Sequence, residues 1–262
     1  MNRRSFMHNS AGLGMLLAAA SLPPSLIGAA RVIGDSDCRE AADLNGRKTF
    51  LLNAPGENKL TPPAKGKIPV AFAISAGVTV IDFAGPWEVF DDVHVQNRGK
   101  EMDEQMPFQL FTVSEILEPL TGSGGLKLVP DYTFASAPAP KVVVVPAQRG
   151  SAALHEWLRK VTATTDVTMS VCTGAFQLAK AGLLTGKTAT THHDFIDQFA
   201  KSFPDVTVKR GLRFVEGEKI STAGGLTSGI DLALRVVDRY FGREVAQATA
   251  AYMEYQSTGW IA

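Results

Sequence analysis

The chain has 262 residues, with 26 basic and 26 acidic side chains and a hydrophobic content of 45%. This length and composition are typical of one globular domain, and the balanced charge gives no support to binding of nucleic acid or of an anionic membrane surface. A protein that acts on a small molecule, or binds one, fits these properties better.

The first 30 residues have the layout of an export signal. Arg3, Arg4 and Phe6 are followed by a mildly apolar stretch and then by small residues at 28–30 that suit cleavage. The paired arginines resemble the twin-arginine type, and the apolar part is too short and too proline-broken to span a bilayer. We predict a cleaved signal over 1–30, export by the twin-arginine translocase and a periplasmic or secreted product. The alternative is an uncleaved N-terminal anchor.

Residues 31–66 mix charge, glycine, asparagine and proline, which predicts an extension or linker without a core of its own. This segment contains Cys38, one of the two cysteines of the chain. Because Cys38 lies in a polar segment and Cys172 at the end of a core strand, a disulfide between them is disfavoured. No lipidation motif precedes Cys38, so we expect a free thiol there. The folded domain is predicted to span residues 67–262.

Strands and helices alternate from residue 67 onward. Strands or short extended pieces are predicted at 68–74, 108–113, 125–129, 142–145, 166–171, 188–191, 206–210, 212–215 and 218–222. Helices are predicted from Asp82 to Phe90, from 151 to 162, from Ala175, from 194 to 203 and from Thr227, the last interrupted near Gly242. This alternation predicts a doubly wound α/β domain with a mostly parallel sheet that is covered on both faces.

Cys172 lies where a short apolar strand changes directly into a helix. The strand ends in small residues, and helical spacing begins at Ala175 with no room for a loop. A nucleophile elbow is built in this way: the turn holds the side chain clear of the sheet, facing unpaired N–H groups of the helix. We therefore expect this thiol to ionise easily. The alternative is an inert, buried thiol.

Other polar groups follow neighbouring strands and can reach the same edge of the sheet. Asp82 follows the first strand, Ala147 and Gln148 follow the valine run, and His192 follows the strand at 188–191. In open parallel sheets, ligands bind beyond the carboxyl ends of the strands. Asp82 could instead be a helix cap and His192 a histidine with a purely structural role.

Two further patterns carry less weight. The sequence His192-His193-Asp194 could ligate a metal ion, but adjacent histidines on one strand point to opposite faces, so we expect no metal site. The glycine-rich segment 122–125 lacks the lysine and the following helix of a phosphate-binding loop, so we predict a turn.

Several motifs together resemble one protein family. The motifs are Val-Pro at 145–146, Val-Cys-Thr-Gly-Ala at 171–175, Ala-Gly-Leu-Leu-Thr-Gly at 181–186, Ala-Thr-Thr-His at 189–192 and the block at 81–90. They are similar to the ThiJ/PfpI superfamily, which includes isonitrile hydratases and the ligand-side domains of certain AraC-type regulators. The resemblance implies a flavodoxin-like fold and a homodimer, and we expect no cofactor.

The resemblance also implies roles for individual residues. Cys172 matches the nucleophile, Asp82 the neighbouring acid of the isonitrile-hydratase-like branch and Thr173 a residue that handles the substrate. Because a thiolate and a carboxylate in contact cannot both ionise cheaply, we expect the pair to share one proton, with sulfur as the anion and Asp82 neutral. Backbone N–H groups at Thr173 and near Ala147 would stabilise developing charge.

The implied activity is a cysteine-dependent hydration of an isonitrile to an N-substituted formamide, a lyase reaction. The chain departs from the family pattern in two places: Ala147-Gln148 replaces Gly-Gly, and His193 replaces a tryptophan. One alternative is a non-catalytic ligand-binding or sensor domain. Another is amidase, peptidase or glyoxalase-like activity, although the block that follows Asp82 favours the hydratase-like branch.

Overall fold

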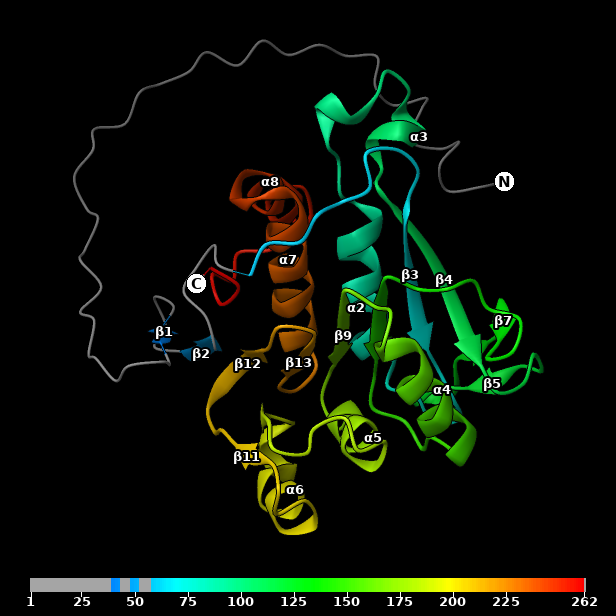
Figure 1. Ribbon diagram of the computed structural model, residues 1–262, viewed down its shortest axis with the longest axis vertical. Coiled ribbons are helices and arrows are strands. Elements are labelled where there is room, and N and C mark those ends of the chain that lie inside the picture. The colour runs from blue at the N-terminus through cyan, green and yellow to red at the C-terminus, as the bar shows by residue number, and fades with distance from the viewer. Residues whose placement is uncertain (1–38, 43–47, 52–57, 262) are drawn as a thin grey trace. The chain divides into compact units, whose positions relative to one another are not determined.

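The computed structural model describes residues 39–42, 48–51 and 58–261 (Figure 1). The predicted export signal at 1–30 and Cys38 lie outside the described residues. None of the helices in the described residues combines the length and the apolar character that crossing a bilayer requires.

One nine-stranded sheet forms the centre of the domain. Its strands, in order across the sheet, are β1 (Arg39–Ala42), β2 (Lys48–Leu51), β12 (Leu212–Glu216), β13 (Ile220–Ala223), β9 (Val167–Ser170), β8 (Val142–Val145), β3 (Ile68–Ala73), β4 (Phe108–Ser114) and β7 (Tyr132–Thr133). All neighbours from β13 to β7 pair in parallel, whereas β12 runs antiparallel to β13 and β1 antiparallel to β2. The predicted mostly parallel α/β sheet is confirmed.

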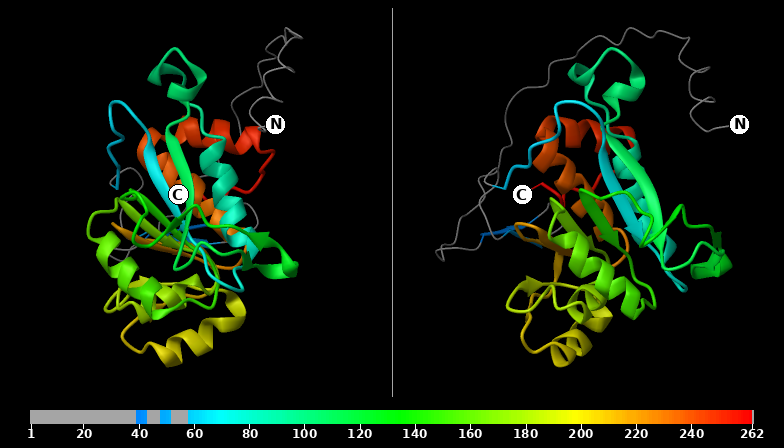
Figure 2. Two further views of the ribbon diagram at one scale, coloured as in Figure 1. Left: turned by 90° about the vertical axis from the view of Figure 1, so that its right-hand side faces the viewer. Right: turned by 45° about the vertical axis from the view of Figure 1, so that its right-hand side comes forward.

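Helices cover both faces of this sheet (Figure 2). The helices are α2 (Val80–Asp91), α3 (Met102–Gln105), α4 (Ala152–Thr162), α5 (Gly174–Lys180), α6 (Ile196–Ser202), α7 (Ser228–Phe241) and α8 (Arg243–Tyr252), with 3₁₀ turns η1 (Gln96–Arg98), η2 (Ser123–Gly125) and η3 (His193–Phe195). The helices α2, α7 and α8 pack on one face, and α4, α5 and α6 pack on the other.

The alternation of side chains along the central strands explains the two layers. In β3, Val70 and Phe72 join the core beneath α2 and α7, while Ala71 and Ala73 join the core beneath α4 and α5. All four side chains are fully buried. Because successive residues of a strand point to opposite faces, a strand buried on both faces reads as a continuous apolar run.

Shorter elements differ from the sequence-based expectation. The strand predicted at 188–191 is only β10 (Thr188–Ala189), which pairs with β11 (Thr207–Val208) in a separate two-stranded sheet. The glycine-rich segment 122–125 forms a turn with η2 between the antiparallel strands β5 (Leu120–Thr121) and β6 (Lys127–Leu128). Within the predicted extension, β1 and β2 pair with each other, and β2 adds to the edge of the main sheet beside β12.

The break in the closing helix lies at Gly242, as predicted. Gly242 has a φ of +88°, which a residue with a Cβ adopts only at a cost, so α7 ends there and α8 begins at the next residue. The change of direction brings α8 and the following residues to Trp260 back over the core beneath α7.

Candidate functional site

The backbone at Cys172 has the conformation of a nucleophile elbow. Strand β9 ends at Ser170 and helix α5 begins at Gly174, so the turn has three residues, and Cys172 has a φ of +58°. A positive φ is rare for a residue with a side chain and costs about 1 to 3 kcal/mol. Gly174 makes the tight turn possible, because a Cβ at that position would lie 2.0 Å from the carbonyl oxygen of Val145.

Hydrogen bonds on both sides of Cys172 hold this strained turn. Its N–H donates to the carbonyl oxygen of Gly224 at 2.7 Å, and its own carbonyl oxygen accepts from the Oγ1 hydroxyl of Thr191 at 2.9 Å. Backbone N–H groups of Thr173 and Leu226 face the sulfur. Thr191 and Leu226 were not predicted as site residues from the sequence, and the φ of +51° at Leu226 is visible only in the folded chain.

Asp82 lies beside the sulfur, in the first turn of α2. Its carboxylate is fully buried, one oxygen (Oδ2) accepts from the N–H of Ala147 at 3.1 Å, and the side chain also interacts with Cys172. The other oxygen (Oδ1) is buried without a hydrogen-bond partner. The N-cap of α2 is Thr79, so Asp82 is not the helix cap that the sequence left open as an alternative.

Both members of this pair hold their protons more tightly than usual. Burial raises the pKa of Asp82 to about 6, although the N–H of Ala147 and the thiol of Cys172 oppose the shift. Burial and the negative charge of Asp82 raise the pKa of Cys172 to about 11, against the opposing effect of the N–H groups of Thr173 and Leu226. One proton is therefore shared by the pair near neutral pH.

The order of the two pKa values is opposite to the expectation from the sequence. An easily ionised Cys172 beside a neutral Asp82 was expected, because the turn presents N–H groups to the sulfur. The folded site leaves Cys172 only 7% exposed and places Asp82 against its sulfur, and these two effects outweigh the N–H groups. The resting site thus holds a thiol next to a carboxylate that can act as its base.

The two residues predicted to contact substrate have hydrogen-bond partners within the protein, and their roles toward a substrate stay predictions. The N–H of Ala147 donates to Asp82 and so orients the acid. The side chain of Gln148 turns back onto the end of β3, where its amide donates to the carbonyl oxygen of Ala73 at 2.7 Å. Its amide oxygen is buried without a partner.

The side chain of Gln177 holds the loop that contains Gln148 and Arg149. This buried side chain donates to the carbonyl oxygens of Gln148 at 3.0 Å and Arg149 at 3.3 Å, and its amide oxygen lies 2.9 Å from Nε2 of His155. In the sequence, the sign of this role is a glutamine within an otherwise apolar helix pattern. Gln177 was not predicted as a site residue.

His192 lies next to the elbow but does not complete it. Its ring packs against Gly225, where a Cβ would lie 2.4 Å from Cδ2 of the ring, and Nδ1 accepts from the N–H of Asp194 at 3.2 Å. Among the described hydrogen bonds, none joins this ring to Cys172. His192 thus packs over the turn beside the sulfur, and its predicted catalytic role stays a prediction.

The prediction that His192 and His193 point to opposite faces is wrong. Both lie after the short strand β10, at the start of η3, and their rings stack with centroids 4.3 Å apart. Ligand atoms of the two histidines and Asp194 lie within 4.8 Å of one another. The two rings therefore do not point apart, as was expected when a metal site was excluded. The Nδ1 of His192, however, already accepts a hydrogen bond from the N–H of Asp194.

Three exposed apolar residues adjoin residues of the site. Ile81, which precedes Asp82, is 38% exposed, and Leu226, whose N–H faces the sulfur, is 42% exposed. Phe195, whose ring centroid lies 5.8 Å from that of His192, is 40% exposed. Large exposed apolar groups next to a buried reactive pair favour a ligand with an apolar part.

Comparisons with known proteins agree with this geometry. A family model described as the DJ-1/PfpI family matches residues 69–239. Isonitrile hydratase of Pseudomonas putida is 32% identical over 192 residues, which cover 71% of this chain and 78% of that protein. The crystal structure of a ThiJ/PfpI family protein from Pseudomonas syringae is 26% identical, with a TM-score of 0.64 over 78% of this chain and 81% of that one.

A transcriptional regulator is also similar. The HTH-type transcriptional regulator GbdR of Pseudomonas aeruginosa is 26% identical over 208 residues, which cover 78% of this chain and 54% of the regulator. The chain thus spans about half of the regulator's length.

Proposed function

Because the chain belongs to the DJ-1/PfpI family, we propose that it is a cysteine-dependent hydratase that converts an isonitrile into an N-substituted formamide. The observation that carries this proposal is the buried pair of Cys172 and Asp82, which shares one proton near neutral pH. The reaction needs a nucleophile for the terminal carbon of the isonitrile and a proton for the same carbon. The pair supplies both.

In the first step, the sulfur of Cys172 attacks the terminal carbon while Asp82 takes the thiol proton. Asp82 then gives this proton to the same carbon, so that a thioimidate, Cys–S–CH=N–R, forms with no net loss or gain of protons. A carboxyl group with a pKa of about 6 suits this exchange, because it can accept and release a proton near neutral pH.

In the second step, water adds to the carbon of the thioimidate. Asp82, ionised again, takes a proton from this water and passes it to the nitrogen, so that the tetrahedral adduct Cys–S–CH(OH)–NH–R forms. Collapse of the adduct breaks the carbon–sulfur bond, releases R–NH–CHO and returns a proton to the sulfur. The N–H groups of Thr173 and Leu226 stabilise charge on the sulfur when it attacks and when it leaves.

Two further observations support this choice. The identity of 32% to isonitrile hydratase extends over most of both chains. The exposed side chains of Ile81, Leu226 and Phe195 suit an isonitrile with an apolar substituent, because the reacting carbon must reach a buried sulfur while the substituent stays at the surface.

The proposal is tested by formamide production from a panel of aliphatic and aromatic isonitriles, with methylglyoxal and peptides in the same screen. Wild type and Cys38→Ala should form the N-substituted formamide, while Cys172→Ala should not. Turnover of methylglyoxal or peptides without turnover of isonitriles would assign the protein to another activity of the family. Equal rates for wild type and Cys172→Ala would remove the basis of the proposal.

The second candidate function is a ligand-binding domain without turnover. Two observations favour it: a sulfur that is only 7% exposed with a pKa of about 11, and the match to the regulator GbdR. In this case an isonitrile or a related apolar ligand would bind, and Cys172→Ala would leave its affinity within about twofold.

Export and dimer formation stay predictions. Cleavage of the segment 1–30 is tested by N-terminal sequencing of protein recovered from the periplasm, and loss of export when Arg3 and Arg4 become lysine would support the twin-arginine route. Sedimentation equilibrium measures the mass of the assembly. A mass of one chain at micromolar concentration would contradict the predicted homodimer.

A further inference from the structure

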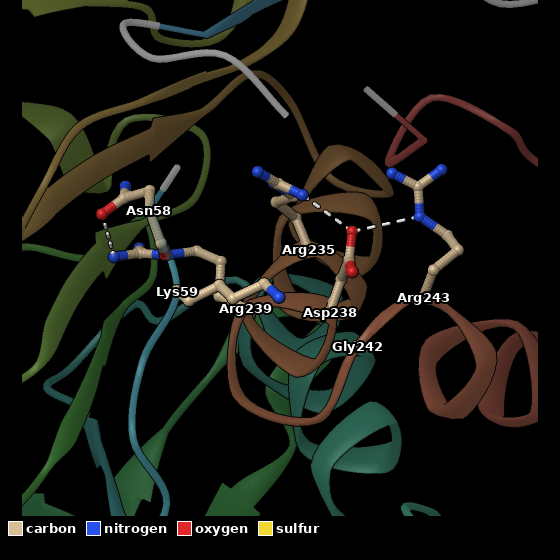
Figure 3. Close-up of a pocket in the computed structure, with 7 residues that line it drawn as sticks. All are labelled: Asn58, Lys59, Arg235, Asp238, Arg239, Gly242 and Arg243. Carbon is tan, nitrogen blue, oxygen red and sulfur yellow. Dashed lines mark hydrogen bonds and ion pairs between the residues drawn. The ribbon is translucent and has the colours of Figure 1, made fainter. Parts of the chain in front are cut away.

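A cavity of about 310 Å³ lies at the far end of α7 from Cys172. Its lining residues are Asn58, Lys59, Arg235, Asp238, Arg239, Gly242 and Arg243 (Figure 3). Arg239 lies 11 residues beyond Ser228 at the start of α7, so the cavity is about 16 Å along the helix from the elbow. Nothing in the proposed reaction uses these side chains.

Positive charge dominates the lining. Four of the seven residues are cations, and Asp238 is the single anion among them. Figure 3 shows Asp238 between two guanidinium groups: its Oδ2 accepts from Arg235 at 2.7 Å and from Arg243 at 3.1 Å. Glu216, outside the lining, pairs with Arg235. Counting Glu216, the cluster keeps an excess of two positive charges.

Arg239 is the buried cation of this cluster that has no carboxylate partner among the described residues. Its side chain is 3% exposed, and within that part of the chain its guanidinium donates only to neutral oxygens: the carbonyl of Asn58 at 2.8 Å, Oδ1 of Asn58 at 3.0 Å and the carbonyl of Glu218 at 2.7 Å. The remaining nitrogen, Nη1, is buried without a partner. A buried guanidinium in this state is costly unless an anion neutralises it.

Burial is the main effect on the pKa of Arg239 and lowers it. The negative charge of Glu216 opposes this shift and the positive charge of Arg235 adds to it, while Tyr240 and Asp166 also oppose it. Lys59, an exposed residue, adds an ammonium group to the lining, and no ion pair joins it to any of the described residues. The cluster therefore attracts an anion from solution.

We propose that this cavity binds a small oxyanion of the phosphate type. Phosphate offers several acceptor oxygens and up to two negative charges, which match a rigid guanidinium and a flexible ammonium group around one space. A volume of about 310 Å³ also leaves room for a small organic group attached to the phosphate. Lys59, Arg239 and Arg243 are the groups that hold the anion.

The proposal is tested on the full chain with inorganic phosphate as the probe, by isothermal titration calorimetry and by thermal unfolding at constant ionic strength set with sodium chloride. Binding at one site per chain is expected. At a phosphate concentration ten times Kd, the ratio of folded to unfolded protein should rise about elevenfold. No saturable binding up to 20 mM phosphate would overturn the proposal.

Paired surface variants separate this site from general charge effects. Lys59→Gln with Arg243→Gln removes two charges from the cavity and should weaken phosphate binding at least tenfold. The matched control, Arg159→Gln with Lys201→Gln, removes two charges from exposed positions on α4 and α6 and should leave Kd within twofold. Equal weakening in both pairs, or no weakening in the first, would contradict the assignment. Because binding is the readout, the result is independent of isonitrile turnover.

Discussion

The contact between Cys172 and Asp82 allows the reactivity of the Cys172 thiol to be predicted quantitatively for the variant Asp82→Asn. The negative charge of Asp82 and its hydrogen bond to the thiol act with burial to raise the pKa of Cys172 from an ordinary 9.0 to about 11. Asparagine removes that charge but leaves the burial, so the thiol pKa should fall part of the way back. The N–H groups of Thr173 and Leu226 then act on the sulfur without an opposing charge.

The size of the effect follows from the two pKa values. At pH 8 a thiol of pKa 11 is ionised to about 0.1%, and one of pKa 9 to about 10%, so the rate of alkylation should rise by up to ~100-fold. Turnover should change in the opposite direction. Without a carboxylate to move the proton from sulfur to carbon, kcat/KM should fall by about 10²- to 10⁴-fold.

The assay is the pH dependence of iodoacetamide labelling, followed by mass spectrometry in a Cys38→Ser background so that one thiol remains. Asp205→Asn, which removes an exposed carboxylate, is the matched control and should label like the parent. Slower labelling of Asp82→Asn with a higher apparent pKa would refute the reasoning. It would mean that a neutral Asp82 donates a hydrogen bond to a thiolate.

Three further predictions follow from the same geometry. The kcat/KM of the wild type should rise with pH through about 6, as Asp82 ionises and becomes a base; a flat profile between pH 5 and 7 would contradict this. Because the pKa of Asp82 is raised in the folded state, the protonated carboxyl stabilises the fold fully below pH 4, and this stabilisation is lost as the pH rises through 6. At pH 7 the free energy of unfolding in urea should therefore be up to about 3 kcal/mol higher for Asp82→Asn than for the wild type. Gly174→Ala should destabilise the protein more than Gly186→Ala. The new Cβ at position 174 would meet the carbonyl oxygen of Val145, whereas alanine at position 186 would only have to adopt a positive φ, which costs about 1 to 2 kcal/mol. Equal urea midpoints for the two variants would count against the elbow geometry.

The layered fold could be predicted because its signals are local. The valine run of β8 is buried on both faces, and the helix after Cys172 starts without a loop, so alternation and spacing indicate the sheet and the elbow directly. Gly242 likewise marks the break between α7 and α8. The strand predicted at 188–191 ends at Ala189 because Thr190 and Thr191 use their polar groups in hydrogen bonds that involve side chains.

The proximity of Cys172 and Asp82 could also be predicted, but their protonation states could not. The proximity of Cys172 and Asp82 follows from strand ends at one edge of the sheet, whereas their protonation depends on burial that only the packed domain creates. The bond from Ala147 to Asp82 and the return of Gln148 onto Ala73 depend on how one loop folds over β3. Neither is visible in residue spacing.

The basic cavity at the end of α7 had no signal in the sequence. Lys59 lies in a segment predicted as a linker, and Arg239 lies 180 positions further on, in the closing helix. Only the packing of this segment against α7 brings them together, with Asn58 bonded to Arg239.

The most direct test of the account is rapid-quench mass spectrometry of the wild type during turnover of an aromatic isonitrile. We predict an adduct on Cys172 heavier than the free enzyme by the full mass of the isonitrile, formed and lost at rates compatible with kcat, and absent from Cys172→Ala. Formamide production without such an adduct at any time point, or by Cys172→Ala at an undiminished rate, would contradict covalent catalysis by this sulfur.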